Sequence, residues 1–216
     1  MTGAAAGITR RGLVGLAAAV ALPVPKADRL AFDVYRNGSR IGRQVLTFHR
    51  SGPALTVETD VKLHVSVVGI RLFHYTGRIV EHWHGETFRS AESHINDNGT
   101  RHAVTAKREA QGIAVSGDRI KPYVAPPDAL PLTYWNKQVL SGPMINLQTG
   151  HTDRPTVTAK GWFKWPAVPS GDVVAREYKL SGALKLAIYY DRAGRWSGLS
   201  FHHRGHITYR PVLDAS

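Results

Sequence analysis

The chain has 216 residues, a formal net charge of +12, 43 % hydrophobic residues and no cysteine. This length suits one domain with a buried core. The lack of cysteine excludes disulfides, thiolate catalysis and cysteine-bound metal clusters, and no apolar run reaches the roughly 18 residues that a membrane-spanning helix needs.

Residues 1–27 have the composition of an export signal. Arg10 and Arg11 precede a short apolar stretch at residues 13–22, and small residues and prolines follow. This order is typical of a secretory signal, and the paired arginines indicate the twin-arginine route. The alternative is an N-terminal helix that the mature protein keeps. We expect a periplasmic protein, soluble after signal removal, whose single domain spans residues 28–216.

The positive charge raises the question of a nucleic-acid partner. The basic residues are scattered singly, the densest group is Lys107 to Glu109, and no nucleic-acid-binding motif occurs. An exported protein also meets little nucleic acid. We therefore expect no nucleic-acid partner, and we interpret the charge as a contribution to solubility or as attraction to an anionic membrane surface.

Most of the remaining chain alternates apolar and polar residues with a period of two, which is typical of strands with one buried face. The clearest case is residues 57–67, whose apolar face carries Val57, Thr59, Val61, Leu63, Val65 and Val67. Turn sequences such as Asn37-Gly38 and Asn98-Gly99 separate these runs. About ten strands of this kind predict an all-β fold, either an up-and-down antiparallel β-barrel or a strongly curved sheet.

The middle of the chain, residues 119–153, breaks this pattern with five prolines, at positions 122, 126, 127, 131 and 143. Prolines at this density are incompatible with central strands. One short helix is expected after Pro131, ending at Gly142. We interpret the segment as an insertion into the barrel-like domain that acts as a lid or plug.

Residues 78–88 read RIVEHWHGETF and concentrate polar side chains on one predicted strand. Residues two apart on a strand share a face. His82 and His84 therefore point one way, and Glu81 and Trp83 point the other. If a site exists on this strand, we expect it on the face of Glu81 and Trp83.

The histidines leave three interpretations open. Imidazole and carboxylate groups bind zinc or iron, so His82, His84 and Glu86 on one face, joined by His202 from another predicted strand, would form a metal site. The same histidines would otherwise lie on the polar outer face of a strand, or one of them would contact a ligand or transfer a proton.

Glu81 and Trp83 share their predicted face with the apolar Ile79. If that face is the interior, Glu81 is a buried carboxylate, and burial raises its pKa unless it is paired. Such a group serves either as a general acid–base or as the partner of an internal arginine.

Tyr134, Trp135 and Asn136 are adjacent in the predicted insertion. Tyrosine and tryptophan combine an apolar body with a polar tip, which suits the mouth of a pocket. The alternative is that Trp135 only anchors the insertion to the barrel.

Several stretches of the chain together resemble a family of exported bacterial proteins. The most specific are E-x-W at residues 81–83, D-N-G at 97–99, Y-W-N at 134–136 and Y-D-x-x-G-R-W at 190–196. On these motifs the chain resembles the DUF6134 family from Phe32 to Arg210, and it is similar in look to DUF3108 proteins. The resemblance implies a β-rich, barrel-like envelope protein and supplies no catalytic residue. His82 and His84 depart from the varied polar residues expected there, so they are a poor basis for a mechanism of the family.

The leading hypothesis is that a barrel cavity binds an apolar or amphipathic small molecule, such as a lipid or isoprenoid. Trp83, Tyr134, Trp135 and Asn136 are the predicted ligand contacts, and Glu81 orients the ligand.

The alternative is a cofactor-free isomerase, cyclase or hydrolase in the same cavity. Glu81 would be its general acid–base, helped by Asn136, Tyr134 or a histidine. A third hypothesis is a metal-binding protein that uses His82, His84 and His202. No cofactor is predicted.

Overall fold

The structure, a computed structural model, describes residue 22 and residues 28–67 and 70–213, with the side chains of 66–72 left undescribed. The predicted export signal at residues 1–27 therefore lies outside the described residues, apart from Leu22. No helix in the described part of the chain is long and apolar enough to cross a lipid bilayer.

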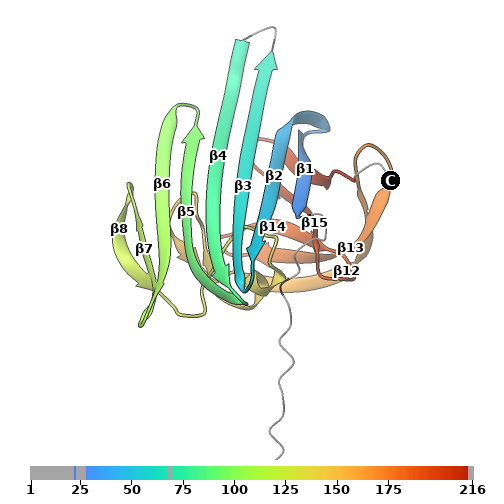
Figure 1. The fold of residues 1–216 in the computed structure, drawn as a ribbon. Coiled ribbons are helices and arrows are strands. Elements are labelled where there is room, and N and C mark those ends of the chain that lie inside the picture. The colour runs from blue at the N-terminus through green and yellow to red at the C-terminus, as the bar shows by residue number, and fades with distance from the viewer. Residues whose placement is uncertain (1–21, 23–27, 68–69, 214–216) are drawn as a thin grey trace, which may run out of the picture.

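Thirteen strands form one sheet in which all neighbours are antiparallel (Figure 1). In sheet order they are β12 (Thr156–Pro166), β13 (Asp172–Ser181), β14 (Leu186–Tyr190), β15 (Trp196–His202), β16 (His206–Pro211), β1 (Arg29–Arg36), β2 (Ser39–Ser51), β3 (Ala54–Val67), β4 (Ile70–His84), β5 (Thr87–Asp97), β6 (Thr100–Glu109), β7 (Gly112–Gly117) and β8 (Ile120–Ala125).

The sheet is strongly curved, with β1–β8 forming one wall and β12–β16 the other (Figure 1). The all-β prediction is confirmed in its curved-sheet form. The sheet does not close into a barrel, because β12 and β8 remain its two edges.

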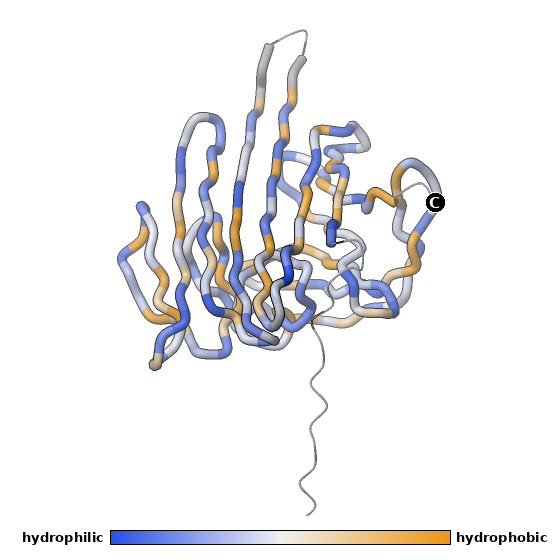
Figure 2. Tube along the Cα trace, in the orientation of Figure 1, coloured by the Kyte–Doolittle hydropathy of each residue, from blue (hydrophilic) through white to orange (hydrophobic). Residues whose placement is uncertain are grey.

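The period-two pattern of β3 places its apolar side chains inside. Leu55, Val57 and Val61 are buried, whereas Asp60 and Lys62 are exposed. Orange and blue segments alternate along β3 accordingly (Figure 2). One hydrophobic core joins the inner faces of both walls.

Two hairpin turns follow the sequence prediction. Asn37 and Gly38 both have positive φ, 49° and 85°, and Asn98 and Gly99 repeat this with 51° and 91°. Two consecutive residues in the left-handed region make a type I′ turn, whose twist matches that of the flanking strands.

The two ends of the described domain meet in the middle of the sheet. β1 pairs with β16, so that Phe32 lies opposite Pro211 and Arg36 opposite Ile207. This single pairing joins the two walls within the sheet.

The predicted insertion, residues 119–153, begins with the strand β8. Pro122 is tolerated there because β8 is an edge strand, which does not need every backbone N–H for pairing. The rest forms a small sheet of β9 (Leu130–Pro131), β10 (Met144–Ile145) and β11 (Thr152–Asp153), and a 3-10 helix, η1 (Lys137–Ser141). The predicted helix is thus present but shorter than expected.

The insertion fills the space inside the curved sheet. Met144 and Ile145 are 0 % exposed and Leu147 is 2 % exposed, and all three belong to the main core. The backbone oxygen of Leu147 also accepts a hydrogen bond of 2.6 Å from Ser93 Oγ on β5. This part of the chain therefore belongs to the core of the domain.

Candidate functional site

The two faces of β4 separate as the sequence predicts. Glu81 and Trp83 are 0 % and 2 % exposed and point inward. His82 and His84 are exposed on the outer face, where His82 Nδ1 lies 3.1 Å from Thr56 Oγ1. The inner face is therefore the one with a secluded chemical environment.

The predicted metal ligands are not brought together. Four strands separate β4 from β15, which carries His202, and the His202 ring stacks on His206 with 5.0 Å between ring centroids. Within the described ranges, no group of three or more His, Asp or Glu side chains is arranged to hold a metal ion.

Glu81 is the centre of a buried hydrogen-bond network. Its Oε1 accepts a bond of 2.9 Å from Trp135 Nε1, and its Oε2 accepts one of 3.1 Å from Trp83 Nε1. Thr133 bonds to the same carboxyl group. No salt bridge to Glu81 occurs among the described residues, so the predicted pairing with an internal arginine is wrong; neutral indole donors take that place.

Two opposing effects set the pKa of Glu81. Burial raises the pKa, and the hydrogen bonds from Trp135, Thr133 and Trp83 lower it, with a net rise from 4.5 to about 7. An indole N–H donates only, so these partners suit the ionised carboxylate, whereas the loss of water suits the protonated acid.

Trp135 anchors the insertion to the wall that carries β4. Its ring packs edge-on against Phe48 at 5.5 Å and Trp83 at 5.4 Å between centroids, and it is 1 % exposed. Asn136 has a different role, because its Oδ1 accepts a bond of 3.0 Å from the backbone N–H of Gln138 and caps η1. The structure thus brings Trp135 to Glu81 but directs Asn136 elsewhere.

Tyr134 faces the opposite wall. Its backbone has a φ of +68°, which is uncommon for a residue other than glycine, and its carbonyl accepts a bond of 2.8 Å from Tyr190 Oη. Its ring lies 5.4 Å from Trp196, which in turn lies 6.3 Å from Tyr209. Because of this backbone conformation, the adjacent side chains of Trp135 and Tyr134 point toward different walls, Trp135 toward β4 and Tyr134 toward β15.

Tyr75, Tyr134 and Tyr209 form what we call the tyrosine cluster. Burial raises the pKa of all three, that of Tyr75 to about 12. A charge on Tyr75 or Tyr134 would raise the pKa of Tyr209 further, so the three phenols lie within electrostatic reach of one another. They come from β4, the insertion and β16 and remain protonated at neutral pH.

The hydroxyl groups of this cluster have few partners. Tyr75 Oη accepts a hydrogen bond from the Gln148 side chain, which leaves its own proton free to be donated. Among the residues that the structure describes, no hydrogen bond involves the hydroxyl group of Tyr134 or of Tyr209. Tyr134 is partly exposed and Tyr209 is 7 % exposed.

A family model covers most of this architecture. It is described as a domain of unknown function, DUF6134, and it matches residues 32–212. The chain belongs to the DUF6134 family. No curated protein and no solved structure matches the chain.

In this DUF6134 chain, three of the four motifs on which the resemblance rested converge in the interior, whereas D-N-G forms the exposed turn at Asn98 and Gly99. The E-x-W and Y-W-N motifs meet where Glu81 and Trp83 contact Trp135. The Y-D-x-x-G-R-W motif supplies Tyr190 and Trp196, which hold the backbone and the ring of Tyr134.

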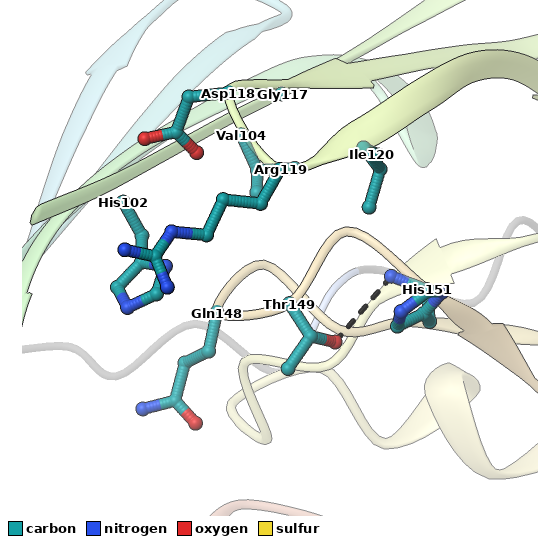
Figure 3. A pocket seen from close by; sticks show the side chains of 9 residues that line it. All are labelled: His102, Val104, Gly117, Asp118, Arg119, Ile120, Gln148, Thr149 and His151. Atoms are coloured by element: carbon teal, nitrogen blue, oxygen red, sulfur yellow. Dashed lines mark hydrogen bonds between the residues drawn. The ribbon is translucent and has the colours of Figure 1, made fainter.

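A cavity of about 210 Å³ lies between β6–β8 and the loop that follows β10 (Figure 3). Its lining includes His102 from β6, Arg119 from the turn between β7 and β8, and Gln148 and Thr149 from the later part of the insertion. None of the predicted ligand contacts lines it. Gln148 links this cavity to the tyrosine cluster, since it lines the cavity and bonds to Tyr75.

Tyr75 and Tyr209 were not predicted as site residues. Tyr75 lies six positions before Glu81, so period-two parity puts both on one face of β4. That signal was present in the sequence. Tyr209 had no comparable signal, because only the fold places β16 near the insertion.

Proposed function

We propose that this protein binds an apolar or amphipathic small molecule, such as a lipid or isoprenoid, at the tyrosine cluster inside its curved sheet. The observation that carries the proposal is that the hydroxyls of Tyr134 and Tyr209 have no protein partner among the described residues. Solvent reaches both hydroxyls, because the fully buried side-chain atoms without a partner in the described residues are others, namely Thr59 Oγ1, Glu86 Oε1 and Arg210 Nε. An oxygen atom of a ligand would replace water as the hydrogen-bond partner of these hydroxyls.

The chemistry around these hydroxyls supports an amphipathic ligand. Phe201 lies 6.4 Å from Tyr209, and Phe73 lies 6.5 Å from Tyr75, between ring centroids. Both phenylalanines are only partly buried. Aromatic walls with a few directed polar groups are typical of small-molecule sites, so the ligand would place its apolar part on the rings and an acceptor oxygen at the hydroxyls.

Glu81 and Trp135 hold the insertion in place beside the proposed ligand site. Trp135 holds the insertion against β4 through its bond to Glu81, and the adjacent Tyr134 is thereby fixed toward the other wall. Trp83, Trp135 and Asn136 were predicted contacts, and they serve this proposal as positioning residues because each is at most 4 % exposed.

The place of action is part of the proposal. The composition of residues 1–27 supports export to the periplasm, where a carrier of apolar molecules would meet lipids of the cell envelope.

The test is to purify the protein and identify co-purifying small molecules by mass spectrometry after organic extraction. We expect an amphipathic species that contains oxygen. Tyr134→Phe and Tyr209→Phe remove one hydroxyl each and keep the rings, so each should weaken binding of that species by about tenfold.

The matched control is Tyr189→Phe, since Tyr189 is 8 % exposed, close to the 7 % of Tyr209, but belongs to a separate cluster with Ala175 and Ala187. It should leave binding unchanged. If no small molecule is recovered and no lipid binds in titrations, or if the control weakens binding as much as the other two variants, the proposal is wrong.

The enzymatic alternative, with Glu81 as general acid–base, stays a prediction. A pKa near 7 suits proton transfer. A substrate would first have to displace Trp135, because both carboxyl oxygens of Glu81 already accept indole hydrogen bonds.

A further inference from the structure

The β12 edge of the sheet carries an unusual concentration of exposed apolar side chains. Three of the most exposed large hydrophobic residues of the described chain lie on β12 and β13, namely Trp162 at 44 %, Phe163 at 46 % and Val174 at 47 %. Soluble proteins seldom gather such side chains on one exposed patch without a partner.

The strand register places these residues next to one another along the edge, on both faces of the sheet. Phe163 lies opposite Ala175, and Val174 lies opposite Lys164, one position along. Because side chains alternate between faces, Trp162 and Phe163 project from opposite faces of the edge strand. A surface that meets the edge of the sheet would therefore contact both rings.

Four basic side chains lie at or beside this edge of the sheet. Arg192 lies over the Trp162 ring at 5.0 Å from its centroid, Arg176 lies directly opposite Trp162, and Lys160 and Lys164 are exposed on β12 itself. None of the four takes part in a salt bridge within the described residues. We call these four residues, with Trp162, Phe163 and Val174, the β12 edge patch.

The acidic residues nearby do not balance this charge. Asp191 is held by Arg195 at 2.8 Å. Asp172 lies at the far end of β13, opposite Pro166, and Glu177 is the single carboxylate of β12 and β13 on the face of Phe163, against four basic side chains in the patch. The patch is therefore positive as well as aromatic.

We propose that the β12 edge patch docks the protein on an anionic lipid bilayer. Tryptophan and phenylalanine partition into the boundary between headgroups and acyl chains, and lysine and arginine beside them are attracted to anionic headgroups. Both features occur together here, in a chain with a net charge of +12.

A second copy of the chain fits this surface less well. Two β12 strands side by side would bring like charges together, and the irregular register between Ala159 and Trp162 interrupts the ladder that an added strand would need. Lipid headgroups have the complementary charge.

The lack of cysteine permits a direct test. Phe163→Cys introduces a single thiol that can carry an environment-sensitive dye. The matched control is Val124→Cys on the other edge of the sheet, where Val124 is 53 % exposed. The full chain is used in both cases, so that residues 1–27 contribute equally. Vesicles of phosphatidylcholine with phosphatidylglycerol should shift the emission at 163 to the blue and leave 124 unchanged.

Pure phosphatidylcholine should give little shift, and added salt should reverse the effect. Replacing both Lys160 and Lys164 with glutamine should weaken vesicle binding on the order of tenfold. An unchanged signal at 163, or equal shifts at 163 and 124, would overturn the proposal. A shift at 163 that depends on protein concentration without vesicles would identify a second copy as the partner and would also overturn it. This test is independent of ligand binding at the tyrosine cluster.

Discussion

Glu81 combines a fully buried carboxyl group with partners that only favour its charged form. Its pKa of about 7 lies above the ordinary 4.5 because burial outweighs the hydrogen bonds. Below about pH 4.5 the group is protonated in both the folded and the unfolded chain. As the pH rises toward 7, the unfolded chain ionises first, so the free energy of unfolding falls.

We therefore predict that this carboxyl group contributes about 3 kcal/mol less stability above pH 7 than below pH 4.5. Urea unfolding over this pH range should show that loss in the natural protein and not in Glu81→Gln. The variant should also be less stable at low pH, since its amide N–H₂ faces an indole donor. Glu109→Gln, at an exposed position of β6, should keep the natural pH profile; a profile unchanged by Glu81→Gln would show that Glu81 titrates normally.

On the outer face of the wall formed by β12–β16, one aromatic side chain of the edge strand β12 links several strands. Trp165 stacks on Tyr189 at 3.8 Å between centroids, and its Nε1 donates to the backbone oxygen of Tyr209 at 2.9 Å. Three strands separate β12 from β16 in the sheet order. The indole crosses this distance over Gly198, where a Cβ atom would lie only 2.1 Å from Trp165 Nε1.

Gly198→Ala should therefore displace Trp165 and lower the free energy of unfolding by about 1–3 kcal/mol. Gly161→Ala is the matched control, because a Cβ there would meet only the Phe163 ring, at 3.8 Å. Near-UV circular dichroism would report the lost Trp165–Tyr189 stack, and chemical denaturation would report the stability. Equal effects of the two substitutions would show that the glycine at 198 serves another purpose.

At the scale of the molecule, local patterns predicted what depends on neighbouring residues. Alternation in residues 57–67 gave the buried face of β3, and parity separated Glu81 from His82. The partners of Glu81 could not be predicted, because Trp135 lies 54 positions away and only the packed insertion brings it there. The tyrosine cluster could not be predicted for the same reason, since its three residues come from the two walls and the insertion.

The pairing of β1 with β16 has a consequence for the order in which the chain is assembled. Residues near 30 leave the ribosome long before residues near 211, yet they are neighbours in the finished sheet. Until the last strand is made, β1 and β15 both present unpaired backbone groups, and such open edges are prone to wrong pairing. Contacts so distant in sequence also form slowly. The sheet is therefore completed late in folding, after the C-terminal strand β16 has been synthesised.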